Sequence, residues 1–249
     1  MNIDHHFTGQ LKTLRLGGLL ETLQIRVKQA EEQELDYISF LQLMVQDEIE
    51  RREAKKLTQR LSRASFEEQK IIEDFDFSFN PKIKRSLVRD LGTCLFIDKK
   101  EHVLICGSAG VGKTHLAQAL GHEACRRRYD VLFVKAVKMF RNLHAARADH
   151  SWEKKMKRYL RPDLLIIDDF GLTALNATQA EDFYEIVTER HLKSSMIITS
   201  NRPPQDWVAL FPDPVMANSA LDRLAHHAHH IIIEGGESYR KKLRPTYST

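Results

Sequence analysis

Residues 103–120 read VLICGSAGVGKTHLAQAL, and this stretch contains the most specific structural pattern of the chain. The apolar run Val103–Cys106 is typical of a short strand, and the residues after the glycines follow a helical pattern. The segment between them satisfies the spacing G-x-x-x-x-G-K-S/T in the order strand, loop, helix. Its glycines let backbone N–H groups surround a phosphate, and the N-terminus of the following helix adds its positive dipole. The predicted phosphate loop consists of Gly107, Ser108, Ala109, Gly110, Val111, Gly112, Lys113 and Thr114.

Two further groups complete a nucleotide site. Lys113 is expected to reach the β- and γ-phosphates of ATP, and Thr114 is expected to offer a hydroxyl to Mg²⁺. About fifty residues on, the apolar run Leu164–Ile167 ends in Asp168 and Asp169. Parallel sheets place ligands at the carboxyl ends of their strands, so Asp168 is the predicted Mg²⁺-side carboxylate. Asp169 is the candidate that polarises the attacking water, and a helix cap is the structural alternative for the pair.

Working outward, five apolar runs of strand type follow one another, and helical patterns separate most of them. This alternation predicts an α/β fold with a five-stranded parallel sheet that is covered on both faces. The predicted strands are Val103–Cys106, Val131–Val134, Leu164–Ile167, Met196–Ser200 and Ile231–Ile233.

Three polar residues near the last two strands are candidates for catalysis. Asn201 directly follows a strand, where it could hold the attacking water or sense the γ-phosphate, and a turn residue before Pro203 and Pro204 is the less favoured structural alternative. Arg223 lies on a predicted helix, from which an arginine can reach a neighbouring subunit's nucleotide and stabilise transition-state charge. Arg240 follows the last strand and could reach the γ-phosphate of its own subunit. For both arginines, a surface ion pair is the alternative.

Residues 1–70 have a helical pattern and no visible chemistry of their own. Leucines and a valine at three- and four-residue steps predict one amphipathic helix over 11–27, and a second helix runs from about Asp36 to about Leu61. Ser65 and Glu68 have the spacing of a capping box, which predicts a short third helix. This segment is interpreted as a small domain for contacts, followed by a larger domain over residues 71–249.

The connection between these two parts is rich in phenylalanine. Phe75, Phe77 and Phe79 alternate with polar residues, which predicts an extended segment. They either wall the adenine ring or simply pack in the core. Asn80 and Pro81 together predict a helix start, and Gly92 its end.

Composition excludes several classes of protein. The chain has 249 residues, of which 42% are hydrophobic and 29% charged. No stretch approaches the roughly 18 apolar residues of a membrane span, and the polar N-terminus lacks the apolar region of a signal peptide. The three cysteines are Cys94, Cys106 and Cys125, without the C-x-x-C spacing of a zinc site. We expect a soluble, cytoplasmic protein without a membrane partner.

The formal net charge of +4 hides an uneven distribution. Residues 126–161 carry 12 basic and 3 acidic side chains, a net of +9, whereas the rest of the chain is near neutral or acidic. Such a localised block is an electrostatic footprint that suits an anionic partner such as DNA, although a charge run by itself is more often a solvated surface helix. The candidate DNA-binding residues are Lys135, Lys138, Arg141, Lys154, Lys155, Lys157 and Arg158.

The histidine cluster 226–230 suggests a metal at first sight. No carboxylate or cysteine stands at ligand spacing from His226, His227, His229 and His230, so packing or interface use is preferred.

Several blocks together resemble the IstB family, which comprises AAA+ helper ATPases of insertion-sequence transposition and is related to the DnaC helicase loaders. The resemblance covers roughly residues 70–244. It rests on the phosphate loop with Thr-His-Leu-Ala, on Leu-Leu-Ile-Ile-Asp-Asp-Phe-Gly at 164–171, on Ile-Thr-Ser-Asn-Arg-Pro at 198–203 with Trp207, and on the blocks 221–229 and 236–240.

This resemblance implies a Mg²⁺-dependent ATPase with an AAA+ core. It implies an oligomer bridged by ATP at its subunit interfaces, which binds duplex DNA and recruits the transposase of the same insertion sequence in a bacterial nucleoid. Asn201 matches the first sensor of the family, Arg223 its arginine finger and Arg240 its second sensor. About 16 residues follow Ile233, too few for the helical lid of other AAA+ proteins.

One departure bears on the rate of hydrolysis. Most AAA+ proteins have Glu where this chain has Asp169, one methylene shorter, so slow hydrolysis is expected. A DnaC-like helicase loader that binds single-stranded DNA is the alternative function. A small-molecule kinase is disfavoured, because neither an acceptor-binding insert nor an arginine-rich lid is visible.

Overall fold

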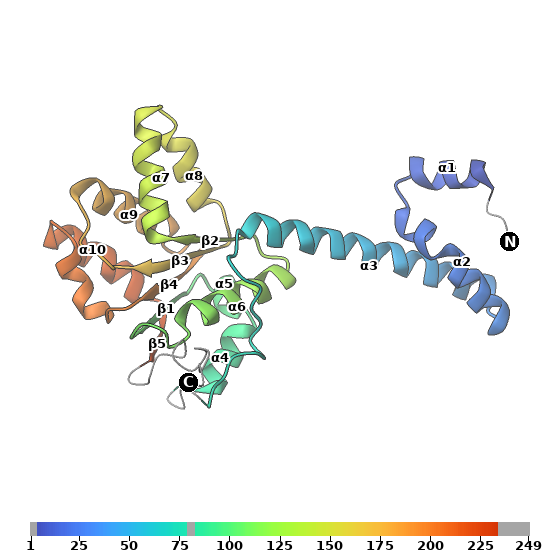
Figure 1. The fold of residues 1–249 in the computed structure, drawn as a ribbon, viewed down its shortest axis with the longest axis horizontal. Helices are drawn as coiled ribbons and strands as arrows, with labels where there is room; N and C mark the ends of the chain where they lie inside the picture. The colour runs from blue at the N-terminus through green and yellow to red at the C-terminus, as the bar shows by residue number, and fades with distance from the viewer. Residues whose placement is uncertain (1–3, 79–82, 234–249) are drawn as a thin grey trace, which may run out of the picture. The chain divides into compact units, whose positions relative to one another are not determined.

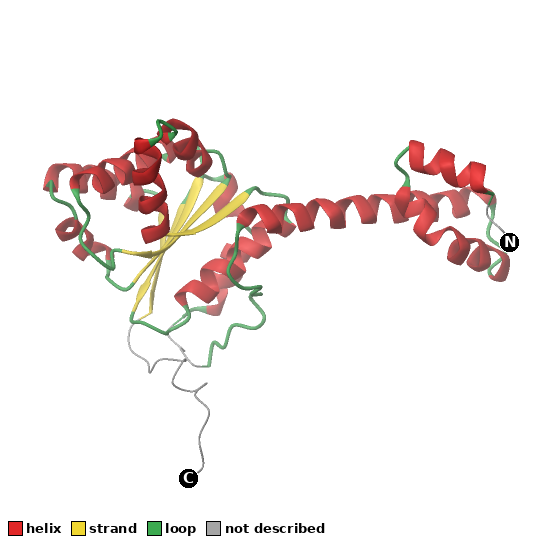
Figure 2. Cartoon of the chain, turned by 45° about the horizontal axis from the view of Figure 1, so that its top comes forward, coloured by secondary structure: helices red, strands yellow, loops and turns green. Residues whose placement is uncertain are grey.

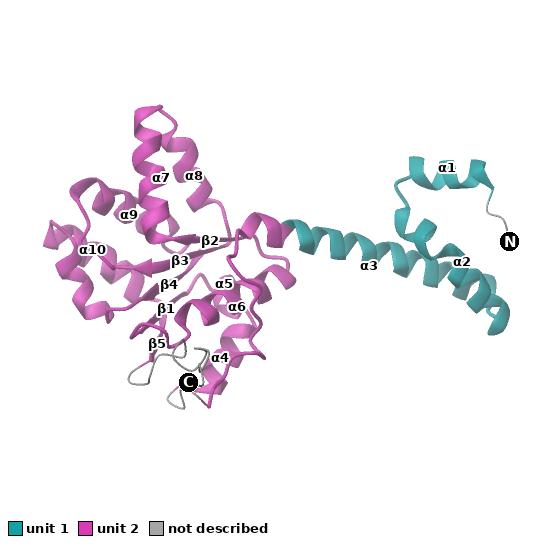
Figure 3. Ribbon diagram, viewed as in Figure 1, with its two compact units in different colours: residues 1–59 teal, residues 60–249 magenta. Residues whose placement is uncertain are grey.

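A computed structural model describes residues 4–78 and 83–233 of the chain. It divides into two compact units, Met1–Gln59 and Arg60–Thr249, which Figure 3 distinguishes by colour.

Unit 1 is helical, as the sequence predicts. Its helices are α1 (His5–Thr13), α2 (Gly17–Glu32) and the part of α3 (Tyr37–Ala64) up to residue 59 (Figure 1). The single helix predicted over 11–27 is wrong, because the chain turns between Thr13 and Gly17.

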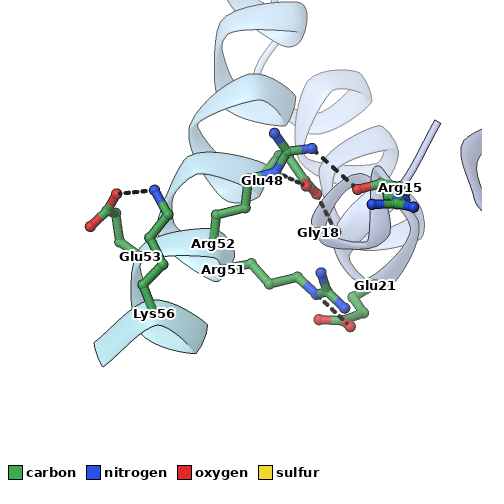
Figure 4. Close-up of polar contacts among 8 residues, drawn as sticks. All are labelled: Arg15, Gly18, Glu21, Glu48, Arg51, Arg52, Glu53 and Lys56. Carbon is green, nitrogen blue, oxygen red and sulfur yellow. Dashed lines mark hydrogen bonds and ion pairs between the residues drawn. The ribbon is translucent and has the colours of Figure 1, made fainter. Parts of the chain in front are cut away.

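The turn between α1 and α2 has a clear cause. Arg15 adopts a left-handed φ of 57°, and the N–H of Gly18 donates a 2.5 Å hydrogen bond to the Glu48 carboxylate on α3 (Figure 4). A Cβ at Gly18 would lie only 2.7 Å from the Glu48 Cα, so glycine is what lets α2 approach α3 this closely. The contact between Gly18 and Glu48 therefore stabilises a turn after α1, although the leucine spacing by itself predicts one continuous helix.

Unit 2 is built on the predicted five-stranded sheet, whose strands are yellow in Figure 2. All neighbouring strands are parallel, in the order β2-β3-β4-β1-β5 (Figure 1). Each strand contains its predicted run and extends it by one to three residues. The strands are β1 (His102–Gly107), β2 (Val131–Lys135), β3 (Leu164–Phe170), β4 (Ser195–Ser200) and β5 (Ala228–Ile233).

Helices cover both faces of this sheet, because successive strand residues point to opposite faces. Leu165 and Ile167 belong to the core formed with α7, α9 and α10, whereas Ile166 packs against Gly121 of α6 on the other face. The helices are α4 (Arg85–Gly92), α5 (Leu95–Asp98), α6 (Lys113–Arg126), α7 (Ala136–Ala148), α8 (Trp152–Leu160), α9 (Ala177–Arg190), η1 (Pro204–Leu210) and α10 (Pro214–Ala225). Among the described residues β5 is the last element.

The short helix predicted from the Ser65–Glu68 capping box is wrong. Ser65 has a left-handed φ of 60°, and the backbone N–H groups of Glu67 and Glu68 donate to Gln118 Oε1 on α6 at 2.9 and 3.1 Å. The ring of Phe66 also stacks on His122 of α6. These contacts replace the hydrogen bonds of the predicted helix. Residues 60–68 belong to unit 2, whereas the second domain predicted from the sequence begins at residue 71.

The phenylalanine segment also differs from its prediction. Backbone hydrogen bonds from Phe75 N to Ile72 O and from Phe77 N to Phe75 O give turns instead of an extended run. Phe79, Asn80 and Pro81 lie outside the described residues. Helix α4 begins at Arg85 and ends at Gly92, so the predicted end is confirmed.

Candidate functional site

The phosphate loop connects β1 to α6 directly, as predicted. Two of its glycines need to be glycine: a Cβ at Gly107 would lie 2.5 Å from Ile233 O, and Gly112 has a left-handed φ of 96° at the start of α6. Phe75 packs on this loop, with its ring 3.0 Å from the position of a Cβ at Gly112. The structure thus places Phe75 beside the phosphate loop in a buried position.

The side chains of Lys113 and Asn201 meet across this site. The Lys113 ammonium donates to Asn201 Oδ1 at 2.6 Å and to Ser108 O at 2.7 Å. Asn201 follows the carboxyl end of β4, which neighbours β1 in the sheet. The structure therefore brings together the predicted lysine and the predicted sensor residue, which are 88 positions apart in sequence.

Asp168 forms the centre of a second hydrogen-bonded group. Thr114 Oγ1 donates to its carboxylate at 2.9 and 3.2 Å, and Thr199 Oγ1 donates to Asp168 Oδ1 at 2.6 Å. Burial raises the pKa of the Asp168 carboxyl above its ordinary value, while the hydrogen bond from Thr199 opposes that rise. Oxygen donors of this kind, a hydroxyl and a carboxylate, fit a hard cation such as Mg²⁺.

Sequence reasoning missed Thr199. It is fully buried in β4, and its hydroxyl also accepts the N–H of Asp169 at 2.9 Å. A buried threonine directly after the apolar run Met196–Ile198, two positions before Asn201, was the signal that could have identified it.

Asp169 lies at the same edge of the sheet, next to Asp168 on β3. Its φ of 56° is left-handed, which is uncommon for a residue other than glycine. The side chain lines a cavity of about 330 Å³ between α7 and α9, together with Arg141 and His144. Strain of this kind is typical of functional positions.

Of the two candidate arginines, Arg223 lies among the described residues. Arg223 is half-buried on α10, where its guanidinium donates to Ser219 O at 2.8 Å and to Ser219 Oγ. It also lies 5.7 Å from the centroid of the Tyr184 ring on α9. Arg240 lies outside the described residues.

A basic groove lies at the opposite edge of the sheet. Its volume is about 1420 Å³, and it runs between α8, the start of β2 and the last turn of α3. Four exposed cations of α8 and its C-cap line it at the spacing i, i+3, i+4, i+7, which is one face of a helix: Lys154, Lys157, Arg158 and Arg161. Arg63 lines the other side, and Asp130 and Glu153 are acidic residues at its rim.

The seven predicted DNA-binding residues therefore do not share one surface. Lys154, Lys157 and Arg158 line the groove, and Arg158 also lines an adjoining cavity of about 150 Å³ with Lys135 and Lys138. In that cavity, Lys135 forms a 2.8 Å ion pair with Glu67. Arg141 faces the Asp169 cavity instead, and Lys155 is half-buried on α8. Arg63 and Arg161 are groove residues that the sequence did not identify.

One buried carboxylate attaches the α7–α8 hairpin, which forms one wall of the basic groove, to the core. Asp182 of α9, 1% exposed, accepts a bidentate pair of hydrogen bonds from Arg147 at 2.8 and 2.9 Å and a third from Trp152 Nε1 at 2.9 Å. The α7–α8 hairpin is thereby attached to α9.

The histidine cluster has packing and ion-pair contacts. The rings of His226 and His227 meet edge to face at 4.2 Å, and His229 Nε2 lies 2.7 Å from Glu101 Oε2. Across residues 4–78 and 83–233, no group of three or more His, Cys, Asp or Glu side chains could hold a metal ion. Within the same ranges, no helix has the length and apolar character that crossing a membrane requires.

Comparisons with known proteins identify the family of this chain. The family model for IstB-like ATP-binding proteins matches residues 9–246. A protein of Mycobacterium tuberculosis named as an ATP-binding protein in an insertion sequence is 45% identical, over 96% of this chain and 95% of its own length. An IS21 ATP-binding protein of Pseudomonas aeruginosa is 35% identical, over 96% of this chain and 89% of its own length.

Solved structures support the fold. AMPPCP-bound DnaA from Aquifex aeolicus matches with a TM-score of 0.59 and 23% identity, over 72% of this chain and 54% of that chain, so the match spans about half of DnaA. DnaI matches with the same TM-score and identity, over 66% of this chain and 91% of that chain. The α/β core is therefore an AAA+ phosphate-loop fold.

Proposed function

The chain belongs to the family of IstB-like ATP-binding proteins, and on that premise we propose that it hydrolyses ATP as a DNA-binding helper of insertion-sequence transposition. Relatives that match nearly its whole length carry insertion-sequence names, which supports this role. The observation that carries the ATPase proposal is the joining of Lys113 to Asn201 and of Thr114 to Asp168 at one sheet edge.

In this proposal, the phosphate loop and Lys113 bind the ATP phosphates, and entry of the γ-phosphate replaces the contact between Lys113 and Asn201. Asn201 is then released to orient the attacking water. Thr114 and Asp168 would hold Mg²⁺, which when bound neutralises charge that develops on the phosphates. Asp169 accepts the proton of the water, and its short side chain together with its left-handed backbone keeps turnover slow.

Arg223 completes the site of a neighbouring subunit. Ser219 of α10 and Tyr184 of α9 contact the guanidinium of Arg223 and fix its position. In this proposal Arg223 acts from that position as an arginine finger on the ATP of the neighbouring subunit. ATP then bridges two subunits, and the chain assembles as an oligomer when ATP binds.

Complementing variants test this arrangement. Lys113→Ala subunits keep Arg223 but lose phosphate binding, whereas Arg223→Ala subunits bind ATP without a finger to offer. Each variant alone should be inactive, and mixing the two should restore ATP turnover, measured as phosphate release. If the mixture stays inactive while both variants remain folded, the proposal for Arg223 is wrong.

The basic groove supports DNA binding. The face formed by Lys154, Lys157, Arg158 and Arg161 spans about 10 Å at 1.5 Å per residue, which corresponds to about three phosphates of one strand at 3.4 Å each. The hydroxyls of Ser62 and Ser65 line the same groove and can donate to phosphate oxygens. Such contacts carry no base information, so we propose binding that is independent of DNA sequence.

Salt dependence measures these contacts. Each phosphate that is neutralised adds about 0.9 to the slope of log K against log salt on duplex DNA. The double variant Lys157→Ala, Arg161→Ala should therefore lower the slope by about 2 per subunit. Lys193→Ala removes an exposed lysine that pairs with Glu189 outside the groove and should leave the slope unchanged.

The strand preference separates the helper from a helicase loader. We expect the ATP-bound chain to prefer duplex over single-stranded DNA and to capture the transposase of its own insertion sequence. A structural relative of the core, DnaA, has been solved with AMPPCP and single-stranded DNA. A strict preference for single strands together with binding of a replicative helicase would overturn the transposition proposal and support the loader.

A further inference from the structure

The cavity of about 150 Å³ that adjoins the basic groove has the lining of an anion site. Three cations from three elements line it: Lys135 of β2, Lys138 of α7 and Arg158 of α8. The hydroxyl of Ser65 and the amide of Asn142 add neutral donors. We call this space the Lys135 cavity. Pockets for whole small molecules measure about 300–1,000 Å³, so the Lys135 cavity has the size for a single phosphate group.

The Lys135 cavity already receives one anionic group from the chain itself. The Glu67 carboxylate lies 2.8 Å from the Lys135 ammonium, and Glu67 is the one acidic residue among the described residues that line the cavity. The side chains of Lys135 and Glu67 are 43% and 47% exposed. Ion pairs with this degree of exposure are weak because water screens them, so a second anion can take the place of the carboxylate.

Backbone contacts bring Glu67 to the cavity. The N–H groups of Glu67 and Glu68 donate to Gln118 Oε1 at 2.9 and 3.1 Å, and the ring of Phe66 stacks on His122 with 4.2 Å between the centroids. Both partners lie on α6, so these contacts hold the segment whether or not the carboxylate forms its ion pair. Rotation of the Glu67 side chain alone is therefore enough to vacate the cavity.

The Lys135 cavity is continuous with the groove that we propose for DNA. Ser65, Leu132 and Arg158 line both spaces. Arg158 also belongs to the cationic face of α8, so a DNA strand that follows this face passes the opening of the cavity. This continuity favours a backbone phosphate of DNA over a free phosphate compound as the occupant.

On the basis of the DNA binding proposed above, we propose that the Lys135 cavity binds one backbone phosphate of DNA, and that the Glu67 carboxylate holds this position until DNA displaces it. Binding then exchanges one anion for another at Lys135, and the displaced carboxylate turns toward water. The phosphate gains Lys138 and Arg158 as further cations of the same cavity. Glu67 thus acts as an intramolecular competitor of DNA.

The variant Glu67→Gln removes the competing charge and keeps the size of the side chain. We expect it to bind a fluorescein-labelled duplex about 2- to 5-fold more tightly than the wild-type chain at fixed salt, measured by fluorescence anisotropy. Lys135→Met should abolish this gain, so that Glu67→Gln has no effect in that background.

Glu153→Gln is the matched control, because Glu153 is an exposed acidic residue that lines the groove and not the Lys135 cavity. It measures general repulsion between an acidic side chain and DNA, and its gain should be smaller than that of Glu67→Gln. An equal gain from Glu153→Gln, or a gain from Glu67→Gln that persists without Lys135, would reduce Glu67 to general repulsion and overturn the proposal.

The salt dependence of binding gives a second readout. Loss of one phosphate contact lowers the slope of log K against log salt by about 0.9 on duplex DNA. We expect this decrease for Lys135→Met, although Lys135 pairs with Glu67 in the structure. Lys193→Met removes another paired lysine, the partner of Glu189, and should leave the slope unchanged. An unchanged slope for Lys135→Met would mean that the ion pair persists on DNA and that the proposal is wrong.

Inorganic phosphate separates the two sources of a phosphate group. Isothermal titration calorimetry of Glu67→Gln with inorganic phosphate measures whether the cavity takes a free anion. Phosphate binding that requires Lys135, together with a DNA affinity that Glu67→Gln leaves unchanged, would make a free phosphate compound the ligand and overturn the proposal. The proposed function fails by a different result, a wild-type chain that binds no DNA. A wild-type chain that binds DNA as tightly as Glu67→Gln keeps that function and overturns only the role of Glu67.

Discussion

The hydroxyl of Thr199 allows a quantitative test of the nucleotide site. It donates to Asp168 Oδ1 at 2.6 Å and accepts the N–H of Asp169 at 2.9 Å, in a fully buried position. Thr199→Val has nearly the same shape, so it removes both hydrogen bonds without opening a cavity. The variant therefore isolates the contribution of the hydroxyl.

The expected cost follows from these two bonds. A hydrogen bond to a charged group contributes about 1.5–3 kcal/mol, and one between neutral groups about 0.5–1.5 kcal/mol. Thr114 still donates to the same carboxylate in the variant, which moves the sum toward the lower part of the range. We expect a loss of about 2–3 kcal/mol in the free energy of unfolding. The pKa of Asp168 should rise further, because the Thr199 bond is what opposes its burial.

Urea unfolding followed by tryptophan fluorescence is the suitable assay. Both tryptophans of the chain, Trp152 and Trp207, lie in unit 2, so the signal reports the unit that contains the site. Thr173→Val is the control, since Thr173 is exposed in the loop after β3, and it should change the free energy by less than about 0.5 kcal/mol. A loss below about 1 kcal/mol for Thr199→Val would refute the bridging role of the hydroxyl.

Three further predictions concern stability. Gly18→Ala should destabilise unit 1 by about 1–3 kcal/mol in thermal unfolding monitored by circular dichroism, because its Cβ would lie 2.7 Å from the Glu48 Cα. Gly9→Ala, with nothing within 4 Å of its Cβ, should be neutral or slightly stabilising. Arg190→Met should cost about 3–5 kcal/mol in urea unfolding of unit 2, because the buried guanidinium donates to four carbonyls of the α8–β3–β4 region. Burial lowers the pKa of His102 from 6.5 to about 4, so the unfolded chain binds more protons between these values. Stability should therefore be full above pH 6.5 and fall as the pH drops toward 4, and His102→Gln should flatten a urea-midpoint profile across that window.

Local patterns predicted which polar side chains gather around the phosphate loop, because their signals are contiguous in sequence. The strand before the phosphate loop, the glycines and Lys113 stand together, and Asp168 and Asn201 directly follow apolar strands. Parallel pairing of β1, β3 and β4 then brings their carboxyl ends to one edge. Thr199 was missed because its role depends on the register between β3 and β4, which the sequence of one strand does not contain.

The wrong predictions have a common physical cause. Ser65 and Glu68 have capping-box spacing, but the backbone N–H groups that would begin this helix donate to Gln118, more than forty residues away. The leucine row of 11–27 continues a helical pattern through a turn that Glu48 stabilises from α3. In both cases backbone N–H groups donate to a side chain that is distant in sequence, and these tertiary hydrogen bonds outweigh the local helical pattern.

The positions of the two surfaces on the sheet constrain how they can influence each other. The phosphate loop, Asp168 and Asn201 lie at the carboxyl ends of the strands, whereas the basic groove begins at residues 130–132, where β2 starts. Five residues of strand span about 16 Å, which is about twice the Debye length of about 8 Å at physiological salt. Direct electrostatic coupling between a groove ligand and the γ-phosphate is therefore weak. Helix α9 offers the packed route, because Asp182 holds Arg147 of the groove wall and Tyr184, two residues on, lies against Arg223. Under the function proposed above, we expect a groove ligand to change ATP turnover by moving the α7–α8 hairpin against α9, and the subunit affected would be the neighbour that receives Arg223.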